Sequence, residues 1–193
     1  MSLKTTLKFD GLRYCSDKYH ISVSQLGGGK FVKTYLISEL FRYVVWLRLG
    51  NWLETHRSLW TKPILLIAKV VHKMQCHSLG IQVDLKTKIG AGLMFVHYSN
   101  IVIKCKSIGS HCTIFQGVTI GNCFSKKTFG VPEIGDNVVI FAGAKVLGNI
   151  KLGNNVVIAA NAVVLDNIPD NCIVGGIPAK IISRKTENVV TNI

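Results

Sequence analysis

The histidine at position 97 is the side chain of this sequence best suited to catalysis near neutral pH. It stands in the stretch LMFVHYSN, which covers residues 93–100. An imidazole exchanges a proton readily at that pH, so it can act as a general base toward a hydroxyl group. A lone exposed histidine usually has no such role. The elements that position His97 must therefore decide between the two interpretations.

Two other groupings are weaker candidates for chemistry. His72 and Cys76 lie one helical turn apart, but no further ligand accompanies them, so we expect no metal site. The run Gly27-Gly28-Gly29-Lys30 has some features of a phosphate-binding loop. That motif needs Ser or Thr where this chain has Phe31. We interpret the run as a flexible linker.

A six-residue period organises the second half of the chain. Thirteen units begin with an aliphatic or aromatic residue and carry a mostly small or aliphatic residue four places later. The first positions are Val83, Ile89, Phe95, Ile101, Ile108, Ile114, Ile120, Ile134, Ile140, Val146, Leu152, Ile158 and Val164. This period fits neither a helix nor a single strand, and it predicts a solenoid of short parallel strands. Three units would form one triangular coil, with neighbouring coils about 4.8 Å apart.

The period is interrupted by one extra residue, Ser107, and by one longer break, and His97 lies outside its inward-facing positions. Fourteen residues separate Ile120 from Ile134, where six would continue the pattern. The intervening segment NCFSKKTFGVPE is polar and basic, so we interpret residues 121–133 as a loop that protrudes from the solenoid. Because His97 does not occupy an inward position, its side chain is predicted to face outward.

Composition narrows the class of protein. The formal net charge is +13, which suggests a polyanionic partner such as a phosphorylated cofactor, an anionic glycan or acidic lipid. No nucleic-acid-binding motif is present, so we expect no nucleic-acid partner. The first ten residues lack the apolar core of a signal peptide, and the six cysteines show no paired spacing. These features favour a reduced, cytoplasmic protein.

Residues 1–80 are predicted to form a helical region. Apolar residues at helical spacing predict helices over 35–53 and 62–78, with Arg42 and Arg48 on a polar face of the first. We expect these helices to cover the open end of the solenoid. The alternative is that this basic, Trp-containing region makes peripheral contact with the inner face of a membrane.

Several stretches together resemble the serine acetyltransferase group of hexapeptide-repeat acyltransferases. They are GVTIGN (117–122), IFAGAKVLGNIKLG (140–153) and GGIPAKII (175–182), besides the repeat and its loop. The stretch FRYVVWLRLGNWL is similar to the first helix of the branch found in exopolysaccharide, colanic-acid and capsule gene clusters. The resemblance implies a mainly β fold, with a left-handed parallel β-helix over 81–182 and a C-terminal tail over 183–193.

The resemblance also implies an activity and a cofactor. It identifies His97 with the catalytic base of an O-acetyltransferase that uses acetyl-CoA and works as a homotrimer, with active sites between neighbouring subunits. For the cofactor it implies backbone contacts at Ala142 and Ala160, a flat wall at Gly143, an opening of the loop at Gly121 and a phosphate-facing Lys180. Lys145 is a weaker phosphate candidate.

The sequence departs from the cysteine-synthesis members of this group on the acceptor side. Those members have Asp where this chain has Val96, and an Arg-His-Pro stretch where this chain has residues 130–132 (GVP). Their acidic residue that orients the histidine corresponds to Gln82, with Asp84 two residues later as a substitute. These differences favour a saccharide hydroxyl in polysaccharide biosynthesis as the acceptor. L-serine acetyltransferase is the alternative, and a catalytically inactive solenoid that serves as a binding scaffold is the second alternative.

Overall fold

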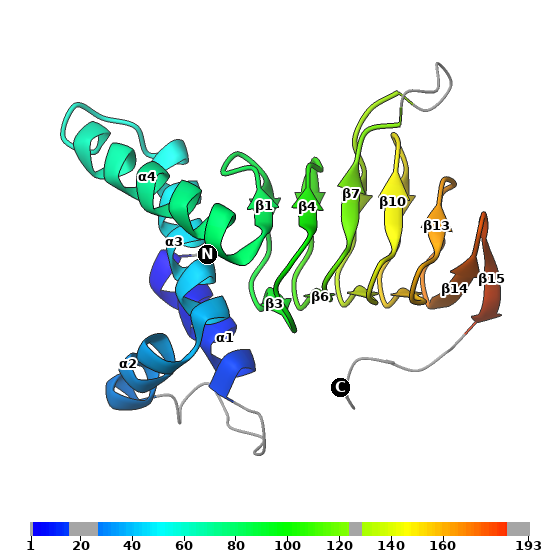
Figure 1. The fold of residues 1–193 in the computed structure, drawn as a ribbon, viewed down its shortest axis with the longest axis horizontal. Coiled ribbons are helices and arrows are strands. Elements are labelled where there is room, and N and C mark those ends of the chain that lie inside the picture. Colours follow the sequence, from blue (N-terminus) through cyan, green and yellow to red (C-terminus); the bar gives the residue numbers. More distant parts are fainter. Residues whose placement is uncertain (1, 16–26, 124–128, 185–193) are drawn as a thin grey trace.

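The computed structural model describes residues 2–15, 27–123 and 129–184. Its first part is helical, and its second part is a column of short parallel strands (Figure 1). The described helices are α1 (Leu3–Cys15), α2 (Gly28–Ile37), α3 (Glu39–Thr55) and α4 (Lys62–Leu79). The predicted mainly β fold is confirmed: a left-handed parallel β-helix follows a short helical region.

Three sheets form the sides of the β-helix, and successive strands from β1 to β14 belong to different sheets. The first sheet contains β1 (Ile81–Val83), β4 (Ile101–Ile103), β7 (Thr119–Gly121), β10 (Lys145–Leu147) and β13 (Val163–Val164). The second contains β2 (Lys88–Ile89), β5 (Ser107–Ile108), β8 (Glu133–Ile134) and β11 (Lys151–Leu152). The third contains β3 (Met94–Phe95), β6 (Thr113–Ile114), β9 (Val139–Ile140), β12 (Val157–Ile158), β14 (Cys172–Gly176) and β15 (Ala179–Arg184).

Strand pairing in the C-terminal half follows the predicted coil of three units. Ile140 pairs with Ile158 and Val146 pairs with Val164, so the partners are three six-residue units apart. All four side chains point inward and are at most 1% exposed. The aliphatic column recognised in the sequence therefore forms the core, and its burial is the main source of stability.

One corner early in the β-helix departs from the six-residue period. Eight residues separate Phe95 from Ile103, whose partners in the next coil are six residues apart. The inward column therefore continues through Ile103, and the prediction of Ile101 at this place is wrong. The additional residues form a turn in which Ser99 has a φ of 99°. Ser99 is the fifth residue of the unit that begins at Phe95, a place where the period predicts a small buried residue, but it is exposed, and His97 lies in the same turn.

The helical region corrects two further predictions. The helix predicted over 35–53 is divided, because the Ser38 side chain caps α3 by accepting a hydrogen bond from the Phe41 backbone N–H at 3.2 Å. The glycine run interpreted as a linker instead begins α2, with Gly27 at the N-cap. Phe31 packs edge to face against Phe41 with ring centroids 5.1 Å apart, and this contact holds α2 against α3.

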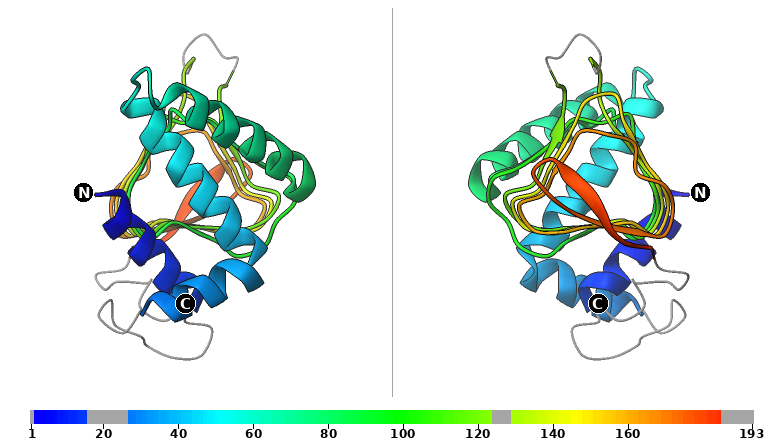
Figure 2. Two further views of the ribbon diagram at one scale, coloured as in Figure 1. Left: turned by 90° about the vertical axis from the view of Figure 1, so that its left-hand side faces the viewer. Right: turned by 90° about the vertical axis from the view of Figure 1, so that its right-hand side faces the viewer.

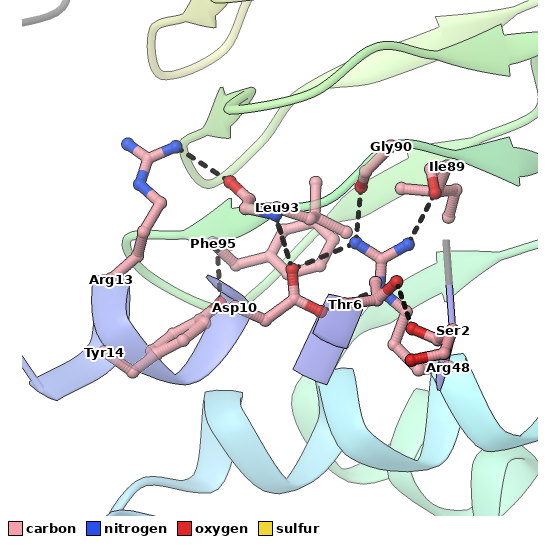
Figure 3. Close-up of polar contacts among 11 residues, drawn as sticks. Ser2, Thr6, Asp10, Arg13, Tyr14, Arg48, Ile89, Gly90, Leu93 and Phe95 are labelled. Atoms are coloured by element: carbon pink, nitrogen blue, oxygen red, sulfur yellow. Dashed lines mark hydrogen bonds and ion pairs between the residues drawn. The ribbon is translucent and has the colours of Figure 1, made fainter. Parts of the chain in front are cut away.

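A buried ion pair joins the helices to the first coil (Figure 3). Arg48 was predicted on a polar helix face, but its side chain is 3% exposed and Asp10 is fully buried. The guanidinium donates to the Asp10 carboxylate at 2.8 and 3.0 Å and to the backbone carbonyls of Ile89 and Gly90. The carboxylate also accepts hydrogen bonds from two backbone N–H groups of the first coil. This pairing makes the burial of Arg48 tolerable.

Both ends of the β-helix are covered (Figure 2). At the first coil, Tyr43 and Leu47 of α3 belong to the same buried cluster as Ile81 and Phe95. At the last coil, β15 turns back antiparallel to β14 and lies across the end of the column. The helices thus cover the open end as predicted.

Two predicted boundaries fall partly outside the described residues. Of the loop predicted over 121–133, residues 124–128 lie outside them, and β7 and β8 flank the loop. Of the tail predicted over 183–193, Ser183 and Arg184 belong to β15, and the remainder lies outside the described residues.

The helix predicted over 62–78 is observed as α4, and it carries a buried histidine. The Nε2 of His72 lies 3.1 Å from the backbone carbonyl of Val83, so it carries the hydrogen and donates it. Burial lowers the pKa of His72, and this hydrogen bond partly offsets the effect. The folded protein therefore binds this proton less readily than the unfolded chain does. Stability should decrease as the pH falls below the ordinary histidine pKa of about 6.5.

We expect the His72→Gln variant to lose less unfolding free energy on acidification than the wild-type protein. Glutamine can donate to the Val83 carbonyl but does not titrate. Urea unfolding followed by circular dichroism at about pH 7.5 and about pH 5.5 measures the difference. All other titrating groups are shared, so the wild-type protein is the matched control. An equal loss in both proteins would contradict the assignment of this pH dependence to His72.

Candidate active site

His97 lies at the corner where the third sheet passes into the first. The parallel pairing of β3, β6, β9 and β12 aligns this corner through four coils. The register aligns Val96 with Phe115, Phe141 and Ala159, and His97, Gln116, Ala142 and Ala160 are the next residues of their coils. His97 begins the longer turn, and across it the Ser99 carbonyl accepts from the Gly117 N–H as the Gln116 carbonyl accepts from the Gly143 N–H. Ala142 is two coils from His97, or roughly 10 Å along the axis. The predicted proton acceptor and the predicted cofactor contacts therefore share one edge of the β-helix.

The imidazole of His97 is exposed and lies beside a row of aromatic rings. Its ring centroid is 6.4 Å from that of Phe115, which is 4.9 Å from that of Phe141. No hydrogen bond or ion pair to this imidazole occurs within residues 2–15, 27–123 and 129–184. The ring can therefore meet a ligand without first breaking a contact. Sequence reasoning missed the aromatic row, although both phenylalanines directly follow a column isoleucine.

Small residues keep the same edge flat beyond His97. The Gly143 N–H donates to the Gln116 carbonyl at 2.9 Å, and the Asn161 N–H donates to the Ala142 carbonyl at 2.9 Å. Gly143 has a φ of 74°, and a Cβ there would lie 2.0 Å from the side-chain oxygen of Asn161. Ala160 is exposed. The predicted wall at Gly143 thus consists of paired backbone with almost no side chain above it.

Replacing Gly143 by alanine should destabilise the protein by about 1–3 kcal/mol, because the new Cβ meets Asn161 and the backbone is left-handed there. The displaced Asn161 should also weaken CoA binding. Gly29→Ala is the control, since nothing lies within 4 Å of a Cβ at that position and the residue belongs to α2, outside the candidate site. Urea unfolding and calorimetric titration with CoA test both effects. If the two variants behave alike, the crowding at Gly143 has no consequence.

Two lysines lie along this edge at different distances from His97. The Lys145 ammonium donates to the Gly117 carbonyl at 2.6 Å and to the Thr119 hydroxyl at 3.1 Å, so it is fixed beside the coil next to that of His97. Lys180 is exposed on β15, where it pairs with Gly175. Five strand steps of the third sheet separate β15 from β3, a length of roughly 24 Å. Lys145 is thus nearer the candidate base, although sequence reasoning ranked it below Lys180.

The structure does not bring Gln82 or Asp84 into hydrogen-bond contact with His97. Gln82 is exposed on β1, in register with Val102. The Asp84 carboxylate accepts a hydrogen bond from the Lys86 backbone N–H at 2.9 Å, which makes it part of a local turn. Both residues line a cavity of about 580 Å³ whose lining does not include His97. The predicted role of these residues in orienting His97 therefore has no contact to support it in the single chain.

The remaining candidate residues are Gly121 and three cysteines. Gly121 ends β7 directly before the loop, as the predicted opening requires. Cys76 lies 3.5 Å from the Nε2 of His72, but no group of three potential metal ligands occurs within the described part of the chain. Cys105 and Cys112 are buried, and burial raises the pKa of both thiols to about 12. Such thiols are poor nucleophiles, and these two side chains fill the core of the β-helix.

Comparison with known proteins agrees with this geometry. A family model described as "Bacterial transferase hexapeptide (six repeats)" matches residues 132–166. Serine acetyltransferase from Synechococcus elongatus is 34% identical over 145 residues, which are 75% of this chain and 57% of that protein. The Staphylococcus epidermidis serine acetyltransferase is 40% identical over 123 residues, 63% of this chain and 58% of that protein.

Solved structures extend the similarity to the whole architecture. A serine acetyltransferase in complex with CoA superposes with a TM-score of 0.71 at 26% identity, over 94% of this chain and 70% of that chain. The enzyme from Brucella abortus superposes with a TM-score of 0.73 at 27% identity, over 94% and 69% of the two chains. Over most of its length, this chain is similar to serine acetyltransferases. These relatives give no support to the exopolysaccharide and capsule branch, or to a role in polysaccharide biosynthesis. This chain spans less than three fifths of the two sequence relatives above.

Proposed function

We propose that this protein is an O-acetyltransferase that transfers an acetyl group from acetyl-CoA to a hydroxyl group, with His97 as the general base. The observation that carries the proposal is the shared edge. An exposed imidazole lies at the same corner of the β-helix as Ala142 and Ala160, and hydrogen-bonded backbone at Gly143 lies between these two residues. One relative of this architecture forms a complex with CoA.

The chemistry needs one proton acceptor and one electrophile. His97 would take the proton of the acceptor hydroxyl while its oxygen attacks the thioester carbonyl carbon. The tetrahedral intermediate then collapses, the carbon–sulfur bond breaks, and the CoA sulfur receives the proton from the imidazolium. The Lys145 ammonium lies one coil away, where its positive charge favours an anionic cofactor or oxyanion. Lys180 would face the cofactor phosphates at the far end of the edge.

We propose L-serine as the first acceptor to test. The sequence relatives and the solved structures described above are serine acetyltransferases, and the similar segments cover between 63% and 94% of this chain. The product would then be O-acetyl-L-serine. This acceptor, the alternative in the sequence analysis, now precedes the saccharide.

A saccharide hydroxyl is the second candidate, and one observation favours it. Val96 stands where the resemblance implies an Asp, Gly130 where it implies the Arg that would hold a serine carboxylate, and Val131 where it implies a second histidine. A site without these charges suits a neutral polyol better than an amino acid, because a zwitterion needs paired charges when it leaves water.

We further propose that the active unit is a homotrimer. On the single chain, His97 is exposed and Phe115 and Phe141 remain half-buried, so the edge has only one wall. A neighbouring subunit would supply the second wall and exclude water from the thioester. Light scattering should then give about three times the chain mass of 21.2 kDa.

The decisive experiment is release of free thiol from acetyl-CoA in the presence of L-serine or of a panel of sugars and nucleotide sugars. Reactions without acceptor or without protein are the controls. Turnover with L-serine supports the first acceptor, and turnover with a sugar alone supports the second. If acetyl-CoA neither binds nor reacts, the protein is a scaffold and the proposal is wrong.

A further inference from the structure

Helix α4 has an apolar row on each of two sides. One side is buried against the molecule and contains Leu65, Ala68, His72 and Leu79. The other side is exposed. It contains Ile64, Ile67, Val70 and Met74, whose exposed fractions are 50%, 58%, 52% and 66%. We name these four residues the outer stripe. Their spacing of three and four residues puts them on one side of the helix.

The apolar surface continues into the turn before α4. Leu59 is 79% exposed and Trp60 is 88% exposed. Figure 1 shows α4 at the outer edge of the helical region, with its N-terminal end and this turn pointing away from the β-helix. Single exposed apolar residues are common on soluble proteins, but a continuous row of this extent marks an interaction surface.

The charges around the outer stripe identify the kind of partner. Residues 54–80 contain Arg57, Lys62, Lys69 and Lys73, all of them exposed, and one carboxylate, Glu54. Glu54 forms ion pairs with Arg57 and Lys69, so Lys62 and Lys73 supply the net positive charge of this surface. A two-fold dimer would bring two such positively charged surfaces together, and their repulsion opposes that contact. The surface therefore favours a partner that is both apolar and anionic.

We propose that the outer stripe, together with Leu59 and Trp60, docks on the surface of a membrane rich in anionic phospholipid. An amphipathic helix with Trp and apolar residues on one side and lysines at its border is the structure that lies in a lipid interface. The docking is peripheral. None of the helices in residues 2–15, 27–123 and 129–184 has the length and apolarity needed to cross a bilayer. Such docking would hold the candidate active site close to the bilayer.

The test is sedimentation of the full-length protein with vesicles. We expect binding to vesicles of phosphatidylcholine with phosphatidylglycerol, weak binding to pure phosphatidylcholine, and weakening by salt. The triple variant Ile67→Ser/Val70→Ser/Met74→Ser should bind at least about tenfold more weakly, because it removes three apolar contacts with lipid. Lys62→Gln/Lys73→Gln should lower binding to the anionic vesicles by roughly tenfold or more.

A matched control comes from α2, on another side of the helical region (Figure 1). Val32, Leu36 and Ile37 are 55%, 66% and 70% exposed, so their triple serine variant removes a similar apolar area and should leave vesicle binding unchanged. A blue shift of tryptophan emission on adding anionic vesicles should largely disappear in Trp60→Phe. These measurements need no acetyl-CoA, so their outcome is independent of the proposed activity.

Three outcomes would overturn the proposal. The first is no binding to anionic vesicles. The second is an equal loss of binding in the α2 and α4 variants. The third is a change in the oligomeric mass of the lipid-free protein when the outer stripe is replaced, which would make this surface an interface between copies of the chain. The replaced side chains are exposed, so circular dichroism should report an unchanged fold for all variants.

Discussion

The variant His97→Ala should release CoA at least about 10²-fold and up to about 10⁴-fold more slowly than the wild-type protein, with either acceptor. The expected loss is that of a general base. Affinity for acetyl-CoA should remain nearly unchanged, because the predicted cofactor contacts lie two and more coils away, at Ala142, Ala160 and Lys180. The free-thiol assay gives kcat/KM, and calorimetric titration gives the dissociation constant.

His111→Ala is the matched control for this experiment. His111 is also an exposed histidine of the β-helix, but its ring packs edge to face against Phe9 with centroids 6.1 Å apart, on the side of the helical region. This variant should retain the wild-type rate. Unchanged turnover in His97→Ala, or an equal loss in both variants, would exclude His97 as the base.

The second large effect is expected for Asp10→Ala, which should lower the free energy of unfolding by about 3–5 kcal/mol. The carboxylate accepts two hydrogen bonds from Arg48 and one each from the backbone N–H groups of Gly92 and Leu93, at 2.8 to 3.0 Å. Its removal leaves a buried guanidinium without its counter-ion and two backbone donors without acceptors. Urea unfolding followed by circular dichroism measures the loss.

Two further variants test whether the expected loss of stability comes from leaving a buried charge without its partner. Glu133→Gln breaks the ion pair between Glu133 and Lys151, which is 3.8 Å long and exposed on both sides, and should change stability by less than about 1 kcal/mol. Asp10→Ala/Arg48→Met removes both buried charges and should recover part of the loss. If Asp10→Ala costs no more than Glu133→Gln, the helical region does not depend on this pair.

The six-residue period was sufficient to predict the β-helix because every unit repeats the same local requirement, an inward aliphatic side chain followed by a small one. The departure at the corner before Ile103 was not recognised, because Ile101 also fits the pattern and both isoleucines are buried. Only the pairing with the next coil shows which of the two continues the column. A local pattern contains no information about that choice.

The candidate site was predictable where it depends on the repeat and not where it depends on contacts between distant segments. The period alone shows that His97, Ala142 and Ala160 each lie two residues after a column residue, at the same corner. In contrast, the burial of Arg48 depends on Asp10, which lies 38 residues earlier and on a different helix. The position of the Gln82 side chain likewise depends on the pairing of β1 with β4, and a local sequence motif does not determine that pairing.

The covered ends of the β-helix prevent the coils of another molecule from extending it. Every coil presents the next one with the same ladder of backbone donors and acceptors, so an uncovered end would accept the first coil of another molecule. Repetition of that contact would produce a fibre with the strand spacing of amyloid. Helix α3 fills one end with Tyr43 and Leu47, and β15 crosses the other in the antiparallel direction. The hairpin of β14 and β15 thus contributes to solubility as well as to the candidate cofactor site, since Lys180 and the protective strand are one segment.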